Sequence, residues 1–240
     1  MYRLGKAIAL LTILWMLALP SAHATHIIGG ELNYRCLGND QYEVTLTIYR
    51  DCNNGDPDAY FDDPAQLGIF QVITDLVTGQ DSIFPTDTIF MEFTGVDDTL
   101  SINVLNACLF VNNTICVHTT TYTDTVTLEP LKLPGGYVLA YQRCCRNDNI
   151  INLLGDSEEI GATYTTFIST EALLNCNNGA SFNDWPPFFI CANEPFEFDH
   201  SATDVDGDSL VYRLCTPFDA ENLSGGDGTP AAPVPPPDRK

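Results

Sequence analysis

The sequence predicts an all-β protein: an Ig-like β-sandwich followed by an incomplete second Ig-like β-sandwich, both stabilised by disulfides. Apolar and polar residues alternate with a period of two in many short segments, which is typical of half-buried strands. Clusters of Gly, Asn, Asp and Pro separate these segments and mark turns. The chain also carries 9 cysteines, and it begins like an exported protein.

The first predicted element is a hairpin. Apolar residues alternate with polar ones in two neighbouring segments, Leu32, Tyr34 and Cys36 in the first and Tyr42, Val44, Leu46 and Ile48 in the second. Between them, Gly38-Asn39-Asp40 tolerates positive φ, so the chain can reverse there and place Cys36 opposite Tyr42.

The remaining strands are predicted from similar patterns. They cover residues 69–73, two strands broken by Pro85 within 81–94, and residues 99–106, 117–128, 137–145 and 163–168. Residues 149–160 are the one segment that could hold a short helix. The second unit reads as strand, strand, Asp-Gly turn and strand.

We expect five regions: a signal peptide at 1–24, a β-sandwich at 25–170, a linker at 171–186, the start of a second, incomplete Ig-like domain at 187–217 and a Pro/Gly-rich tail at 218–240. A basic start, an apolar run and Ala22-His23-Ala24 predict cleavage after Ala24 and secretion. A membrane anchor is the alternative, but the run is short of the roughly 20 residues that span a bilayer. Three strands make a poor sandwich alone, so we expect partner domains beyond Lys240.

Charge narrows the possible partners. The chain has 32 acidic and 10 basic residues, a formal net charge of −22. Such a surface repels nucleic acid and anionic membranes and attracts cations. We therefore expect no nucleic-acid binding. No second apolar run of about 20 residues follows the predicted signal peptide, so we also expect that the chain does not span a membrane.

The cysteines predict a disulfide framework. Cys36 and Cys52 would lie about 30 Å apart along the hairpin, far beyond the ~7 Å that a disulfide spans, so they should not pair. The segment CLFVNNTIC is nearly symmetric and predicts a hairpin with a Cys108–Cys116 disulfide. Cys52 is expected to pair with Cys144 or Cys145. The other candidates are Cys176, Cys191 and Cys215. Zinc is the rival interpretation, but the chain contains no Cys-x-x-Cys pair.

Asp204, Asp206 and Asp208 alternate along the chain and could converge on one calcium ion. The alternative is a polar turn held by aspartate side chains. The loop is no EF-hand, because Cys215 stands where that motif needs a glutamate. His200 is interpreted as a surface residue.

Catalysis is not expected. Ile27-Ile28-Gly29-Gly30 resembles the start of trypsin-like proteases, and Ser209 faintly resembles their nucleophile. No glycine follows Ser209 to shape an oxyanion hole, however, and no acid–base pair has a clear role. Asn112 and Asn222 lie in glycosylation sequons that matter only in a eukaryotic source.

Three long segments carry a resemblance to a known family: THIIGGELNYRCLGNDQYEVTLTIYRDC, CVHTTTYTDTVTL with PGGYVLAYQRCCRN, and PPFFICANEPFEFDHSATDVDGDSLVYRLCTP. They resemble the N-terminal part of large exported Bacteroidota proteins of the gliding motility-associated, PKD-domain type. The resemblance implies a cell-surface protein exported by type IX secretion. The second unit also resembles cadherin-like repeats, whose aspartates bind calcium; Asp204, Asp206 and Asp208 match that pattern.

The sequence therefore predicts a non-enzymatic, secreted or cell-surface structural or adhesion module of a larger protein, linked to gliding motility by resemblance alone. Its partners would be its own further domains and an extracellular glycan or surface protein. The alternative function is a carbohydrate-binding module of a glycan-processing protein, for which Tyr60, Phe61 and Trp185 would serve as exposed aromatic residues.

Overall fold

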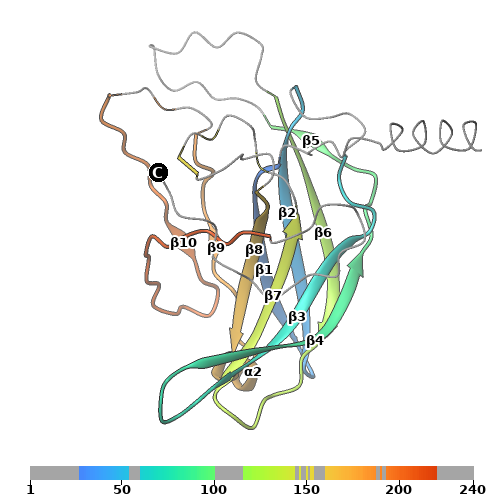
Figure 1. The fold of residues 1–240 in the computed structure, drawn as a ribbon, viewed down its shortest axis with the longest axis vertical. Coiled ribbons are helices and arrows are strands. Elements are labelled where there is room, and N and C mark those ends of the chain that lie inside the picture. The colour runs from blue at the N-terminus through green and yellow to red at the C-terminus, as the bar shows by residue number, and fades with distance from the viewer. Residues whose placement is uncertain are drawn as a thin grey trace, which may run out of the picture.

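A computed structural model describes residues 27–53, 60–100, 116–143, 146, 150, 152–153, 160–187, 190 and 193–220. Two four-stranded antiparallel sheets face each other and confirm the predicted all-β sandwich (Figure 1). The predicted signal peptide, both glycosylation sequons and most of the residues proposed for a short helix at 149–160 lie outside the described residues.

One sheet, here called sheet A, has the strand order β1-β2-β6-β5, and the other, sheet B, has the order β4-β3-β7-β8. The strands of sheet A are β1 (Ile27–Gly38), β2 (Gln41–Asp51), β6 (Val117–Thr127) and β5 (Asp98–Thr99). Those of sheet B are β4 (Asp81–Met91), β3 (Ala65–Thr74), β7 (Gly135–Arg143) and β8 (Ala162–Ser169). After β8 come α2 (Thr170–Asn175), β9 (Ser181–Phe182) and β10 (Ala202–Thr203).

The first hairpin forms as predicted. Cys36 pairs with Tyr42 in the register of β1 and β2. The turn residues Gly38, Asn39 and Asp40 have φ values of 84°, 53° and 61°, in the left-handed region that Gly, Asn and Asp adopt most readily.

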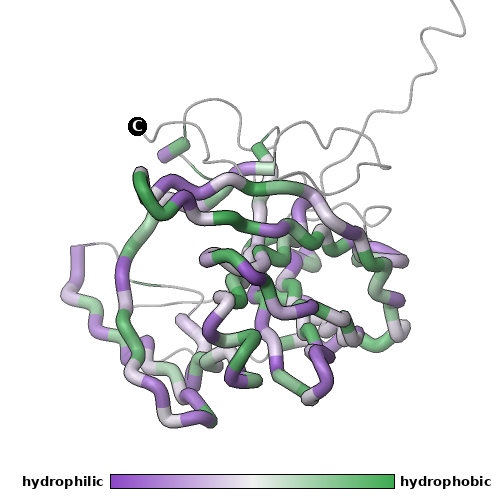
Figure 2. The backbone as a smooth tube through the Cα atoms, turned by 90° about the horizontal axis from the view of Figure 1, so that it is seen from below, coloured by the Kyte–Doolittle hydropathy of each residue, from purple (hydrophilic) through white to green (hydrophobic). Residues whose placement is uncertain are grey.

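The period-two pattern explains the core. Side chains from β2 and β6 meet side chains from β3 and β7 in the core, and buried residues alternate with more exposed ones along β2 and β6. Hydrophobic and hydrophilic stretches interleave along the backbone (Figure 2). Leu46, Leu67 and Leu139 have no solvent exposure. Burying each such side chain contributes about 1.5–3 kcal/mol, which makes the apolar alternation the main determinant of the sandwich.

The prediction of two strands broken by Pro85 is wrong. Residues Asp81–Met91 form one strand, β4, at the edge of sheet B. Pro85 is tolerated because an edge strand needs hydrogen bonds on one side alone. The register slips between Ile69 and Phe70 opposite this proline, and the Thr86 hydroxyl there donates to the Ile69 carbonyl at 2.8 Å.

A polar cluster joins the two sheets at one end of the core. The Asp62 carboxylate accepts a hydrogen bond of 2.6 Å from the Tyr141 hydroxyl and forms an ion pair with Arg143, both on β7. The Asp62 carbonyl accepts a 2.8 Å hydrogen bond from the hydroxyl of Tyr122, on β6. Arg143 also donates to the Tyr60 carbonyl at 2.7 Å. One loop residue therefore connects sheet A to sheet B.

The chain after β8 returns to β1, the edge strand of sheet A. The predicted linker, residues 171–186, contains most of α2 and all of β9. Among the described residues of the second unit, Ala202–Thr203 is the one predicted strand region that forms a strand, and it pairs with β9. Farther along, Thr163 of β8 donates to the Phe218 carbonyl at 3.3 Å, and Ala220 is buried.

The two resolved disulfides differ from the predicted pairings. Cys52 bonds to Cys116 and Cys36 bonds to Cys176, with Cα–Cα distances of 5.2 and 5.3 Å. The predicted Cys108–Cys116 bond and the predicted bond from Cys52 to Cys144 or Cys145 are therefore both wrong. The reason is the β2–β6 register, which sets Asp51 opposite Val117 and so brings Cys52 beside Cys116. The prediction that Cys36 and Cys52 do not pair is confirmed. Cys108, Cys144, Cys145 and Cys191 lie outside the described residues, whereas Cys215 is a free, exposed thiol.

The buried tyrosines make the stability of the fold dependent on pH in the alkaline range. Burial, and then the nearby Asp62 carboxylate, raise the pKa of Tyr141 well above 10 in the folded protein. In the unfolded chain this tyrosine ionises near pH 10, so the unfolded state loses the proton first. We expect the free energy of unfolding to fall as the pH rises above about 10.

Urea denaturation at pH 9 and pH 11 measures this effect. Tyr141→Phe should be less stable than the wild type at pH 9 and should lose less of its remaining stability by pH 11. An equal pH-dependent loss in both proteins would show that Tyr141 does not titrate with unfolding.

Candidate functional site

The Cys36–Cys176 disulfide fixes the C-terminal segment against β1. α2 begins at the Ser169 cap, whose hydroxyl accepts a hydrogen bond from the Ala172 amide, and it ends at Cys176 in the left-handed conformation. That reversal brings residues 177–181 alongside β1. The Gly179 amide donates to the Tyr34 carbonyl at 3.0 Å, and a Cβ on Gly179 would lie 2.2 Å from the Asn33 side chain. The close approach explains why a glycine stands at this position.

Polar side chains complete the attachment. The Asn33 side-chain amide donates to the Ala180 carbonyl at 3.0 Å and to the Ser181 hydroxyl at 2.9 Å. The Asn178 side-chain oxygen Oδ1 accepts a hydrogen bond from the Cys36 backbone amide at 3.0 Å. The disulfide and these hydrogen bonds together make residues 176–181 a covalently held border of sheet A.

The three predicted metal ligands lie together beside this border. Each aspartate offers one carboxylate oxygen, and these three oxygens lie within 4.8 Å of one another, as ligands of one cation would; the residues are Asp204, Asp206 and Asp208. Asp204 also accepts hydrogen bonds from the backbone amides of Asp206 and Asp208, at 2.9 and 3.2 Å. The structure therefore brings the three aspartates together, and it also forms the aspartate-held turn of the alternative interpretation.

Two asparagines connect the aspartate loop to the sandwich. The Asn178 backbone and side-chain amides donate to Asp206 at 2.7 and 3.0 Å, and the Asn177 side chain donates to Asp208 at 2.5 Å. Asn178 thus bridges Cys36 and Asp206. Neither asparagine was predicted as a site residue; the one signal in the sequence was their position directly after Cys176, whose partner the sequence does not specify.

The acidic loop also lies near a buried tyrosine. The pKa of Tyr34 is raised to about 12 by burial first, then by Tyr42 and then by the carboxylates of the aspartate loop. The negative charge of the loop therefore acts on β1, the edge strand of sheet A that carries Tyr34.

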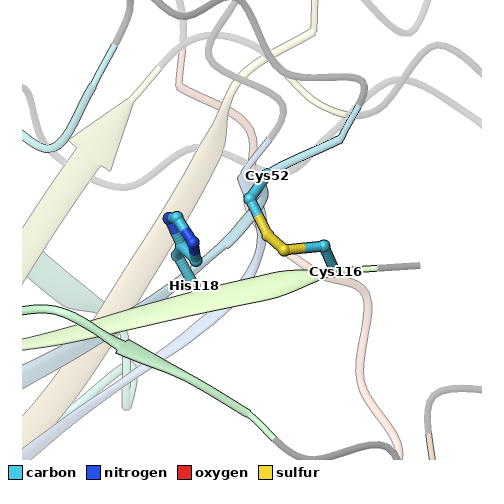
Figure 3. A group of neighbouring side chains, drawn as sticks. All are labelled: Cys52, Cys116 and His118. Carbon is cyan, nitrogen blue, oxygen red and sulfur yellow. A yellow bond between two sulfur atoms is a disulfide. The ribbon is translucent and has the colours of Figure 1, made fainter. Parts of the chain in front are cut away.

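A second group of metal-ligand residue types sits at the other disulfide. Cys52, Cys116 and His118 lie close together (Figure 3). The two sulfurs are bonded to each other, so neither can serve as a thiolate ligand. The Nδ1 atom of His118 lies 3.2 Å from the Asp97 carboxylate, without the angle of a hydrogen bond. The group is a structural disulfide with a histidine beside it.

The aromatic residues proposed for glycan binding have different surroundings. Phe61 is buried, with 6% of its surface exposed, so its prediction as an exposed residue is wrong. Tyr60 packs against Phe61 and Phe93, and the Arg50 guanidinium lies over its ring at 5.4 Å. Trp185 remains 52% exposed and touches Tyr49 edge-on at 4.8 Å. Of the three, Trp185 alone combines substantial exposure with a fixed support on a sheet face.

Comparison of the chain with models of protein families, with characterised proteins and with solved structures found no match. Within the part of the chain that the structure describes, no helix has both the length and the hydrophobicity to cross a membrane.

The disulfide connectivity gives a direct test of this site. Peptide mapping without reduction should recover Cys36 linked to Cys176 and Cys52 linked to Cys116. The Cys36→Ser/Cys176→Ser double variant should lose about 2–5 kcal/mol of stability, because its disulfide closes a loop of 140 residues. A peptide linking Cys52 to Cys144 or Cys145 would contradict the structure.

Proposed function

We propose that the chain is a non-catalytic, extracellular β-sandwich module that spaces and presents contact surfaces in a larger cell-surface protein. The observation that carries this proposal is the pair of disulfides between segments 64 and 140 residues apart. Such bonds persist in oxidising compartments, in agreement with the signal peptide predicted from residues 1–24. The resemblance to exported Bacteroidota proteins supports the same location, with type IX secretion as its route.

The covalent framework suits a mechanical role. Both disulfides involve sheet A: one joins the end of β2 to the start of β6, and the other joins β1 to the segment after α2. Cross-links of this kind reduce the freedom of the unfolded chain and resist opening of the sheet edge. A spacer on a cell surface needs that resistance. We therefore place the gliding-linked adhesin function above an enzymatic one.

Localisation of the protein in its source cells tests the proposal. Immunoblots with serum against residues 25–170 should detect it in the surface or medium fraction, with Thr25 as its first residue. A band far above 26.4 kDa would support a larger parent protein. A cytosolic protein that begins at Met1 would contradict extracellular function.

Calcium binding by Asp204, Asp206 and Asp208 stays a prediction, and it can be separated from loop docking. Calcium titration by calorimetry should give a Kd of about 10⁻⁴–10⁻³ M, as in other extracellular modules. Asp204→Asn should abolish the binding. Asn178→Ala, which removes a docking contact and no carboxylate, is the matched control and should still bind calcium. If the wild type gives no heat of calcium binding, the three aspartates only stabilise a turn.

A further inference from the structure

The outer face of sheet A carries a regular array of hydroxyl groups. β6 presents a threonine at every second position, and β2 adds two more. We call these residues the threonine face: Thr45, Thr47, Thr121, Thr123, Thr125 and Thr127. Thr119 continues the β6 row, but its hydroxyl oxygen is buried and is not counted in this face. They alternate with the buried residues Leu46, Ile48, Tyr122 and Val126, which point into the core. These hydroxyls therefore point away from the core between the sheets.

The register makes this array periodic in two directions. Thr47 lies opposite Thr121 and Thr45 opposite Thr123, and β2 and β6 pair over their whole length without a bulge. The Thr47 and Thr121 hydroxyls lie 3.3 Å apart. Threonine positions thus recur about 6.6 Å apart along each strand, and the two strands lie about 4.8 Å apart. Thr121, Thr123, Thr125 and Thr127 are exposed.

Threonine is favoured in strands for its shape alone, so the array by itself does not indicate a ligand. The position of Trp185 beside it does. The Trp185 ring comes from a segment distant in sequence and contacts the Tyr49 ring edge-on. Tyr49 lies opposite Thr119 and is followed in β2 by the buried residue Arg50. About half of the Trp185 side chain stays exposed, although burial of so large an apolar group would be favourable.

The position of Trp185 is fixed from both sides. Toward the N-terminus, β9 is joined to β10, and the Asn183 amide donates to the Ser201 carbonyl at 3.0 Å. Upstream of β9, the Cys36–Cys176 disulfide holds the segment on β1. Pro186 and Pro187 follow the ring and restrict the backbone. An aromatic surface held in this way loses little conformational entropy when it binds a ligand.

Charge on this face selects among ligands. On β1, the uncharged Asn33 lies beside Thr45, and the carboxylate of Glu31 lies beside Thr47. At one end of the face Arg35 is neutralised by Glu43 at 2.9 Å. The whole chain carries a net charge of −22, so an anionic polymer would be repelled. An apolar protein partner would find hydroxyls around the tryptophan instead of further apolar side chains. The complementary ligand is neutral and rich in hydroxyls, and it has an apolar face for the ring.

We propose that the threonine face and Trp185 form a binding platform for a neutral polysaccharide. The C–H face of a sugar ring would pack on Trp185, and hydroxyls of the neighbouring sugars would exchange hydrogen bonds with threonine hydroxyls, which both donate and accept. This site is independent of the spacer function proposed above, and it replaces Tyr60 and Phe61 as the residues of the carbohydrate-binding alternative.

Affinity electrophoresis of the chain in gels containing barley β-glucan, xylan or mannan tests the proposal, with the anionic polymer alginate as a reference. At least one neutral polysaccharide should retard the wild type, and alginate should not. Trp185→Ala should weaken the retardation about tenfold or more, as loss of an anchoring tryptophan usually does. Thr47→Val/Thr121→Val removes two hydroxyls with little change of shape and should also weaken it. Thr165→Val, on β8 of the opposite sheet, is the matched control and should bind normally.

Fluorescence gives an independent readout, because Trp185 is the one tryptophan after the predicted signal peptide. Binding should shift its emission to shorter wavelength in the wild type and less in the threonine double variant. The proposal is overturned if no neutral polysaccharide retards the chain, if alginate retards it equally, or if Thr165→Val weakens binding as much as the threonine-face variants.

Discussion

The Cys36–Cys176 disulfide is the constraint on which both candidate surfaces depend. It converts the segment after β8 from a connection into a border of sheet A, across a separation of 140 residues. Asn178 then links the aspartate loop to β1, and the continuing chain carries Trp185 to Tyr49. A disulfide acts mainly by limiting the unfolded chain, so it favours docking without specifying the polar contacts that orient each surface.

The interior depends on a different, noncovalent constraint. Hydrophobic contact is not directional, so apolar packing alone leaves the two sheets some freedom of relative orientation. Asp62 removes that freedom: its carboxylate binds Tyr141 and Arg143 of sheet B, and its carbonyl binds Tyr122 of sheet A. The Asp62 side chain is half-buried, so it keeps part of its hydration while the hydrogen bonds of this residue to both sheets contribute orientation. The two constraints are complementary: the contacts of Asp62 orient the two sheets, and the Cys36–Cys176 disulfide holds the C-terminal segment on sheet A.

The strands were predictable because their signal is local. Alternation at Tyr42, Val44, Leu46 and Ile48 reports directly which face is buried, and the core confirms it. Cysteine pairing is not local. The near-symmetric sequence around Asn112 suggested a bond from Cys108, but Cys116 follows the register of β6 with β2, which alternation does not specify. The three aspartates were found from their spacing, whereas Asn178 and the support of Trp185 required knowledge of Cys176's partner.

Because Trp185 and the aspartate loop share one attached segment, ligands at either surface would be linked thermodynamically. A ligand that contacts Trp185 and the threonine face together binds the docked segment better than the released one, so it stabilises docking. A cation at Asp204, Asp206 and Asp208 would compete with Asn177 and Asn178 for carboxylate oxygens, and it would also relieve the repulsion among those carboxylates. The sign of the coupling between cation and polysaccharide therefore depends on which of these two effects is larger. In either case the coupling passes through the short stretch between Cys176 and Trp185, which makes that stretch the part of the molecule where the two surfaces can influence each other.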